Sequence, residues 1–123
     1  MPGIEEPVRE RAQELGRVIG QTDEFRALSR ARERISDDRE AVQRMNRLSE
    51  LERAVSEALH QGEEPSASVQ EEYERVFGEL QATPGYQALV AAQSNFDKIL
   101  MQVNEEIGRG MESGGRSRII MPS

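Results

Sequence analysis

The sequence predicts an all-α protein of about five helices in a bundle, with a long third and a long final helix. Good helix formers (Glu, Gln, Arg, Ala and Leu) dominate it, and aromatic residues make up only 4%. Apolar residues recur at spacings of three and four, whereas no segment shows the alternation typical of a strand. Residues that start or end helices separate these runs. A chain of 123 residues is expected to form a single helical domain.

The first helix is expected over about residues 7–19, ending at Gly20, with Val8, Ala12, Leu15 and Ile19 on its apolar face. Thr22 can cap the second helix, because its hydroxyl can accept a hydrogen bond from a free backbone N–H. Phe25, Leu28 and Ile35, with Ala31 beside them, form the apolar face of the second helix.

Asp37 followed by Glu40 fits a capping box and predicts the start of the third helix, which runs to about Gln61 and stops at Gly62. One face of this helix carries the apolar side chains of Ala41, Met45, Leu48, Val55 and Leu59. A loop follows, and Ser68 with Glu71 fits a second capping box that starts the fourth helix. The face of the fourth helix carries Val69, Tyr73, Val76, Phe77 and Leu80.

The final helix is the longest amphipathic run. Thr83 is a good N-cap, Pro84 suits the first helical position, and neither Gly nor Pro recurs between Tyr86 and Gly108. An apolar stripe at spacings of three and four makes this face a candidate oligomer interface. The residues of this interface are Leu89, Gln93, Phe96, Leu100, Val103 and Ile107. Gln93, the polar member, is either a partly exposed position or a buried group that fixes the register of an oligomer.

The expected organisation is a lead over residues 1–7, one helical domain over 8–108 and a flexible tail over 109–123. The tail is rich in Gly, Ser and Arg, yet it holds the apolar cluster Ile119-Ile120-Met121. This cluster either belongs to a disordered end or docks on the protein or a partner.

Composition excludes several classes of function. The chain has no cysteine, so disulfides and thiolate chemistry are excluded. No apolar run approaches the roughly 20 residues that span a membrane, and no signal-peptide pattern begins the chain, which predicts a cytoplasmic protein without membrane insertion. The net charge of −7 argues against a general nucleic-acid binder. Its distribution is uneven, however, because residues 54–82 hold seven Glu and one Arg, whereas residues 26–53 hold eight Arg and six acids.

Arg26, Arg30 and Arg34 recur every four residues and line one face of the second helix, with Arg44 and Arg47 following in the third. Such a series is either a solvated face paired with nearby Glu or a basic face for a partner. We take the first three as a candidate partner face. Direct RNA binding is the less favoured reading, since no aromatic side chains interleave with the arginines.

No arrangement of residues predicts catalysis. Glu57 and His60 match the spacing of a di-iron helix, but that site needs two such motifs and His60 is the only histidine. In the last turn of a helix, His60 instead complements the helix dipole. Most pairs of adjacent acids fall at predicted helix starts or in the loop, and all of them are interpreted as caps or solvated groups. We therefore expect no enzymatic activity, no metal and no cofactor.

Four segments resemble the YlbF/YmcA family of bacterial competence and biofilm regulators. The first is Leu15-Gly16-Arg17-Val18-Ile19 followed by Phe25, and the second runs from Ile35 to Val42. The third is Gln61-Gly62-Glu63-Glu64, and the fourth is Thr83-Pro84-Gly85-Tyr86 before the last helix. Their order and spacing span about residues 8–110.

The resemblance implies a non-catalytic adaptor that binds other proteins, as a homodimer or as a hetero-oligomer with related regulators. Well-studied relatives act in a complex that influences RNA processing by a membrane-associated endoribonuclease, and through it competence, sporulation and biofilm formation. Some relatives carry cysteines associated with an iron–sulfur cluster in that complex. This chain, which has none, resembles a cysteine-free branch. A helical RNA-binding protein or a structural helical protein are the alternatives.

Overall fold

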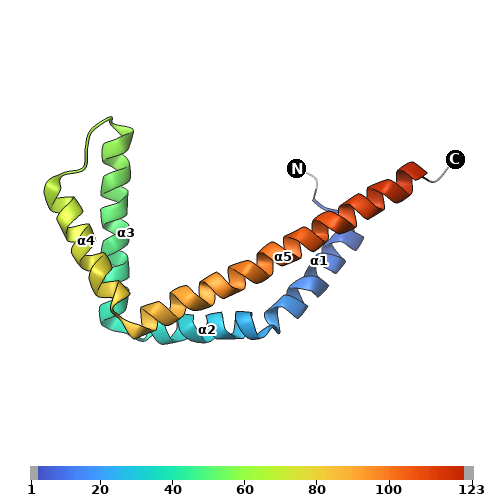
Figure 1. The fold of residues 1–123 in the computed structure, drawn as a ribbon, viewed down its shortest axis with the longest axis horizontal. Coiled ribbons are helices and arrows are strands. Elements are labelled where there is room, and N and C mark those ends of the chain that lie inside the picture. Colours follow the sequence, from blue (N-terminus) through green and yellow to red (C-terminus); the bar gives the residue numbers. More distant parts are fainter. Residues whose placement is uncertain (1–2, 121–123) are drawn as a thin grey trace. The chain divides into compact units, whose positions relative to one another are not determined.

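The computed structural model describes residues 3–120, with side chains described up to residue 115. In this part of the chain all regular structure is helical, which confirms the all-α prediction with a long third and a long final helix (Figure 1). The helices are α1 (Glu6–Gly20), α2 (Asp23–Ser36), α3 (Arg39–His60), α4 (Ala67–Gln81) and α5 (Pro84–Ile120).

The predicted helix boundaries are largely confirmed, but two of the expected caps are wrong. The Thr22 hydroxyl accepts from the backbone N–H of Phe25 at 3.1 Å, as expected. Helix α3, however, begins one residue later than predicted, so that Asp38 rather than Asp37 accepts from the N–H of Ala41. At α4 the capping side chain is Ser66, two residues before the expected Ser68. Several Asp and Ser residues stand together at each boundary, and any of them could cap a helix, so sequence alone places the boundary only to within two residues.

Gly62 ends α3 in the way that its residue type predicts. Its φ of +74° lies in the left-handed region, which glycine enters without steric cost. The N–H of Glu63 then reaches the carbonyl of Ala58 at 2.8 Å, and the N–H of Gly62 reaches that of Leu59 at 3.1 Å. These two bonds form a Schellman motif, which satisfies the last free carbonyls of the helix and turns the chain toward α4.

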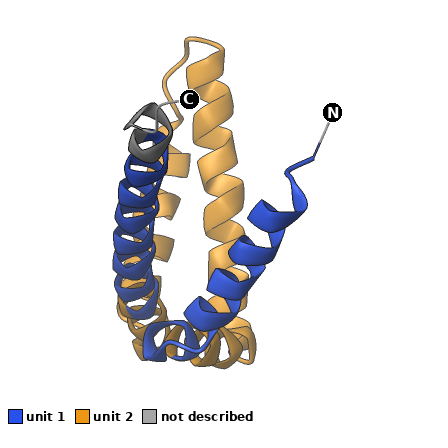
Figure 2. Ribbon diagram, turned by 90° about the vertical axis from the view of Figure 1, so that its right-hand side faces the viewer, with its two compact units in different colours: residues 1–26, 92–123 blue, residues 27–91 orange. Residues whose placement is uncertain are grey.

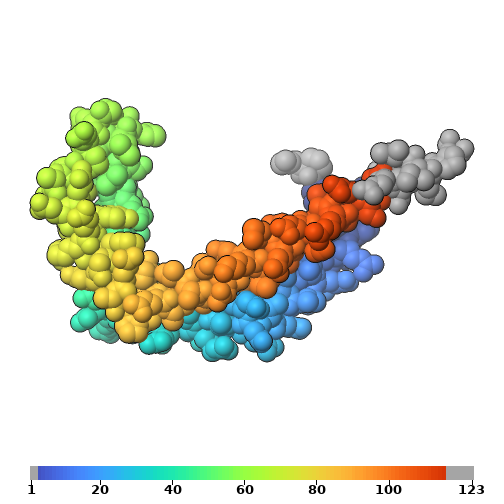
Figure 3. All heavy atoms as spheres, in the orientation of Figure 1, coloured from blue at the N-terminus to red at the C-terminus, as the bar shows by residue number. Residues whose placement is uncertain are grey.

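Residues 27–91 form one compact unit, which contains nearly all of the buried core (Figure 2). Helices α3 and α4 pack against each other as an antiparallel hairpin, visible as the green and yellow segments of Figure 3. Leu48 and Leu51 from α3 meet Val76 and Leu80 from α4, and half-buried side chains surround them. Leu59, expected on the same face, is 64% exposed and lies outside the buried cluster.

Residues 1–26 and 92–123 form the second compact unit, which contains α1 and most of α5. Phe25 and Phe96 pack together in it, with ring centroids 5.4 Å apart. Ala92 is its one buried apolar residue among those described. Helix α1 has no buried residue and leans away from α5 toward its first turn (Figure 2). The apolar face predicted for α1 is therefore present but largely uncovered.

Helix α5 continues past Gly108 to Ile120, so the end predicted at Gly108 is wrong. Glycine weakens a helix by only about 1 kcal/mol, whereas proline breaks it, and the next proline is Pro122. The side chains of the Ile119-Ile120-Met121 cluster lie outside the described residues. The expected division into a lead, one domain and a flexible tail stays a prediction.

Candidate functional site

One flank of the α3–α4 hairpin carries an ion-pair network. Arg47 donates to both carboxylate oxygens of Glu72, at 2.6 and 2.7 Å, and to Glu50 at 2.9 Å. Arg44 donates to Glu79 at 2.9 Å. The fork of an arginine suits such two-point contacts with a carboxylate. Two members of the arginine series, Arg44 and Arg47, therefore join α3 to α4 and are not free to meet a partner.

The Arg47–Glu72 pair favours the charged form of both groups. The hydrogen bonds from Arg47 lower the pKa of Glu72 and outweigh the opposing effect of desolvation, and the positive charges of Arg47 and Arg75 add smaller contributions that also lower it. The same contacts with Glu72 and Glu50 raise the pKa of Arg47. Both side chains stay partly exposed, so solvent screens the attraction. The pair thus sets the register of the two helices more than it stabilises them.

The candidate partner face on α2 consists of exposed side chains. Arg26, Arg30 and Arg34 are all exposed, and none of them takes part in an ion pair with another residue of the described range. Arg34 lies beside Gly85, where an added Cβ would stand 3.8 Å from its Nε. Their role as a partner face stays a prediction.

The candidate oligomer stripe on α5 is only partly covered. Leu89, Gln93, Phe96 and Val103 are half-buried, while Leu100 and Ile107 are 37% and 44% exposed. The Gln93 amide donates to the Asp97 carboxylate one turn along the same helix, at 2.9 Å. Gln93 is thus a half-buried position with a bond inside its own helix. The use of this stripe as an oligomer interface stays a prediction.

An apolar groove runs between α1 and α5 within the unit formed by residues 1–26 and 92–123. It has a volume of about 430 Å³. Its walls are Leu15, Ile99, Gln102, Val103, Glu106 and Ile107. Large apolar side chains of the same unit are more than a third exposed, both in the two helices and at Ile4 just before α1, namely Ile4, Val8, Leu15, Val18, Leu100, Met101, Ile107 and Met111. A soluble helix normally buries its apolar stripe, so this set marks a surface that a partner could cover.

Sequence reasoning missed Met101 and Met111, and it did not show that the predicted apolar face of α1 is left uncovered. Met101 lies outside the 3/4 stripe, and Met111 lies beyond the expected helix end. The apolar face of α1 was predicted from the spacing of its residues. That spacing does not show whether another segment of the same chain or a partner covers the face. A separate signal was available for the methionines, because exposed methionine is common at adaptable binding surfaces.

The single histidine lies where the sequence predicts. His60 stands exposed in the last turn of α3. Among the described residues, no group of three His, Cys, Asp or Glu side chains is arranged to hold a metal ion. No helix in the described range is both long and apolar enough to cross a membrane.

Residues 8–112 match the family described as "Control of competence regulator ComK, YlbF/YmcA". The chain belongs to this family. The resemblance inferred from its four local segments is thereby confirmed, and with it a place among bacterial regulators.

Other YlbF/YmcA-like proteins are similar over most of their length. A UPF0342 protein of Leuconostoc citreum (strain KM20) is 22% identical over 98 residues, which cover 80% of this chain and 83% of that protein. The crystal structure of Bacillus subtilis RicA in complex with RicF superposes with a TM-score of 0.71 at 17% identity, covering 88% of this chain and 96% of that one. A Bacillus stearothermophilus protein of unknown function (DUF964) gives a TM-score of 0.67 at 20% identity, covering 94% and 100%. At these identities the solved structures support the fold alone.

Proposed function

We propose that this YlbF/YmcA-family protein is a non-catalytic regulatory adaptor. It acts by pairing with a second helical chain through α1 and the part of α5 that follows residue 92. The second chain is either another copy or a related regulator. The complex so formed affects RNA processing, and through it competence or biofilm development.

The observation that carries the proposal is the uncovered apolar surface of α1 and α5. Helix α1 has no buried residue although its apolar side chains share one face. Leu100, Met101, Ile107 and Met111 add exposed apolar surface from α5. Because burial of apolar surface is the main favourable contribution to association, a helical partner laid on this surface would gain stability from the contact.

Two comparisons support the proposal. The family description places its members in the control of a competence regulator. Bacillus subtilis RicA, which has a similar fold, was crystallised in complex with a second protein, RicF. The link to RNA processing and biofilm development rests on the resemblance to well-studied relatives.

The test is the oligomeric state in solution. We expect sedimentation analysis at micromolar concentration to give a mass above that of one chain, either alone or with a co-expressed family member. Leu100→Glu with Ile107→Glu should return the protein to a single chain, because both side chains are already exposed and the substitutions leave the core intact. Leu59→Glu, at a 64% exposed leucine of the other unit, is the matched control and should leave the mass unchanged.

Two results would contradict the adaptor proposal. One is a single-chain mass for the wild type, both alone and with every family member from its own genome. The other is an equal loss of association in the Leu59→Glu control, since that result would reflect general aggregation behaviour. In cells, the double variant should reproduce the change in RNA ends that deletion of the gene causes.

Direct RNA binding through the arginine face of α2 is a second candidate function. It is favoured by the exposure of Arg26, Arg30 and Arg34 and by the lack of ion pairs for them within the described residues. Contacts of this kind release counterions, so RNA retention should fall steeply with salt. Reversing the charge of all three residues should abolish retention. Unchanged retention in that variant would remove RNA binding from consideration.

A further inference from the structure

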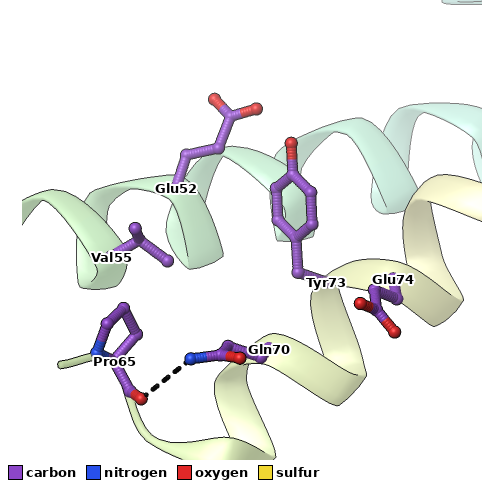
Figure 4. A pocket seen from close by; sticks show the side chains of 6 residues that line it. All are labelled: Glu52, Val55, Pro65, Gln70, Tyr73 and Glu74. Carbon is purple, nitrogen blue, oxygen red and sulfur yellow. Dashed lines mark hydrogen bonds between the residues drawn. The ribbon is translucent and has the colours of Figure 1, made fainter.

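A second hollow lies within the unit of residues 27–91, between α3 and α4 near their connecting loop. Its volume is about 390 Å³, inside the range of about 300–1,000 Å³ typical of binding pockets. Figure 4 shows Glu52 and Val55 from α3, Gln70, Tyr73 and Glu74 from α4, and Pro65 from the loop. Two carboxylates thus stand at the border of a largely apolar hollow, and none of its six lining residues is basic.

The pocket is preorganised by contacts of its own walls. The Gln70 amide donates to the carbonyl of Pro65 at 3.1 Å, which ties the loop to the first turns of α4 (Figure 4). The ring of Tyr73 stacks on Phe77, with centroids 6.0 Å apart and planes 17° apart. Both aromatic side chains pack on the hairpin core. A ligand would therefore meet walls that are already held in place, which lowers the entropic cost of binding.

The two flanks of the hairpin differ in how their acids are neutralised. Glu72 and Glu79 are paired with Arg47 and Arg44 on the flank described above. Glu52 lies five positions after Arg47, about 140° further around the helix, and therefore on the opposite flank. Over the residues that the structure describes, neither Glu52 nor Glu74 has an ion-pair partner.

The charge of the surrounding chain strengthens this contrast. Residues 54–82 contain seven Glu, one Arg (Arg75) and one His (His60). Arg75 itself faces Glu72 and Glu79 on the neutralised flank. The pocket flank therefore presents two carboxylates without an ion-pair partner among the described residues, next to an apolar wall, and a ligand that fits it combines a positive charge with an apolar stem.

We propose that the pocket between α3 and α4 binds an arginine or lysine side chain carried by a basic, amphipathic segment of a partner protein. The aliphatic stem of that side chain packs on Val55 and Pro65, and its positive charge lies in the combined field of Glu52 and Glu74, whose carboxylates stand on opposite sides of the Tyr73 ring (Figure 4). The ring of Tyr73 adds a cation–π contact, which arginine makes more often than lysine. Apolar residues that flank the basic side chain can cover Leu59, which is one helical turn from Val55 and exposed.

This site is separate from the proposed adaptor interface. The pocket is built by residues 52–74, whereas the interface lies in residues 1–26 and 92–123. Each proposal can therefore fail without the other. A protein that proves to be a single chain in solution can still bind the basic segment, and an oligomer can lack that activity.

The experiment uses the full chain and a synthetic helical peptide with arginines on one face and leucines on the other. Binding is measured by fluorescence anisotropy, and its site by chemical-shift changes in the labelled protein. We expect the shifts to concentrate on the lining residues of the pocket. Glu52→Gln with Glu74→Gln should weaken binding by about tenfold or more, since charge-assisted contacts are the strong ones.

The matched control is Glu57→Gln with Glu71→Gln. It changes the net charge equally and on the same two helices, at exposed glutamates that do not line the pocket. It should weaken binding by less than about threefold, through the long-range field alone. A peptide in which citrulline replaces each arginine should bind no better to the wild type than to the Glu52/Glu74 variant.

Several outcomes would overturn the proposal. Equal weakening by the two double variants would mean that the peptide senses only net charge. Shifts centred on residues of α1 or α5 would move the binding to the other unit. Undiminished binding of the citrulline peptide would reduce the site to an apolar contact without selectivity for a cation.

Discussion

Replacing Leu80 by alanine tests whether the α3–α4 contact is the stable centre of the molecule. Leu80 is fully buried in the cluster with Leu48, Leu51 and Val76. Leu59→Ala is the matched change, because it removes the same atoms from α3 at a site that is 64% exposed. The two variants differ only in how much of the lost side chain is packed.

The expected magnitude follows from burial. Leucine to alanine removes three carbons, each worth about 0.8 kcal/mol when fully buried, for a transfer loss of about 2.4 kcal/mol. A cavity that cannot collapse adds to this, so the loss at Leu80 should lie between about 2.4 and 5 kcal/mol. At Leu59 only the buried third of the side chain counts, which gives about 0.9 kcal/mol.

Amide hydrogen exchange is the suitable assay, because it reports the opening free energy of α3 and α4 without assuming that the two compact units unfold together. The loss of opening free energy at the slowest amides of both helices should be about three to six times larger in the Leu80 variant than in the Leu59 variant. Similar losses in the two variants would refute the reasoning, since burial would then not decide the stability of the hairpin.

Three other changes in the same unit have predictable outcomes. Glu72 has a lowered pKa, so its contribution to stability is fully present above its unfolded value of about 4.5 and is lost as the pH falls through the folded value. Glu72→Gln should therefore flatten the acid limb of a plot of thermal stability against pH, and an unchanged limb would contradict the pairing with Arg47. Gly62→Ala should destabilise the protein by about 1–2 kcal/mol in denaturant titrations, because its φ is +74°. Gly78→Ala lies within α4 with open space around the new Cβ, and it should stabilise the protein by up to about 1 kcal/mol. A lower free energy of unfolding in this variant would contradict the helix-propensity argument.

Sequence reasoning predicted the elements of this fold because helix signals are local. Gly62 ended α3 and Pro84 opened α5 for reasons contained in a few neighbouring residues. The same reasoning placed the caps of α3 and α4 one or two residues away from the real ones, since adjacent residues compete for that role. It also ended α5 at Gly108. A glycine can either end a helix or lie within one, and the local sequence does not distinguish the two cases.

The candidate sites were predicted less completely, because a binding surface is made by segments that are distant in sequence. Arginine spacing could not separate Arg44 and Arg47, which pair with α4, from Arg30 and Arg34, which stay exposed. Nothing local to Glu52 or Glu74 distinguishes them from the other glutamates. Their shared pocket exists only because α3 and α4 pack antiparallel.

By itself, the sequence determined the all-α class, the order of the five helices, most of their boundaries and the membership in a regulatory family. All of these follow from periodicity, capping chemistry and short segments of residues read in order. Only the tertiary structure decided which apolar faces find a partner within the chain. The faces of α3 and α4 cover each other, whereas that of α1 stays largely exposed and that of α5 is only partly covered. Burial depends on what lies opposite a side chain, and periodicity records only the side of the helix on which that side chain lies.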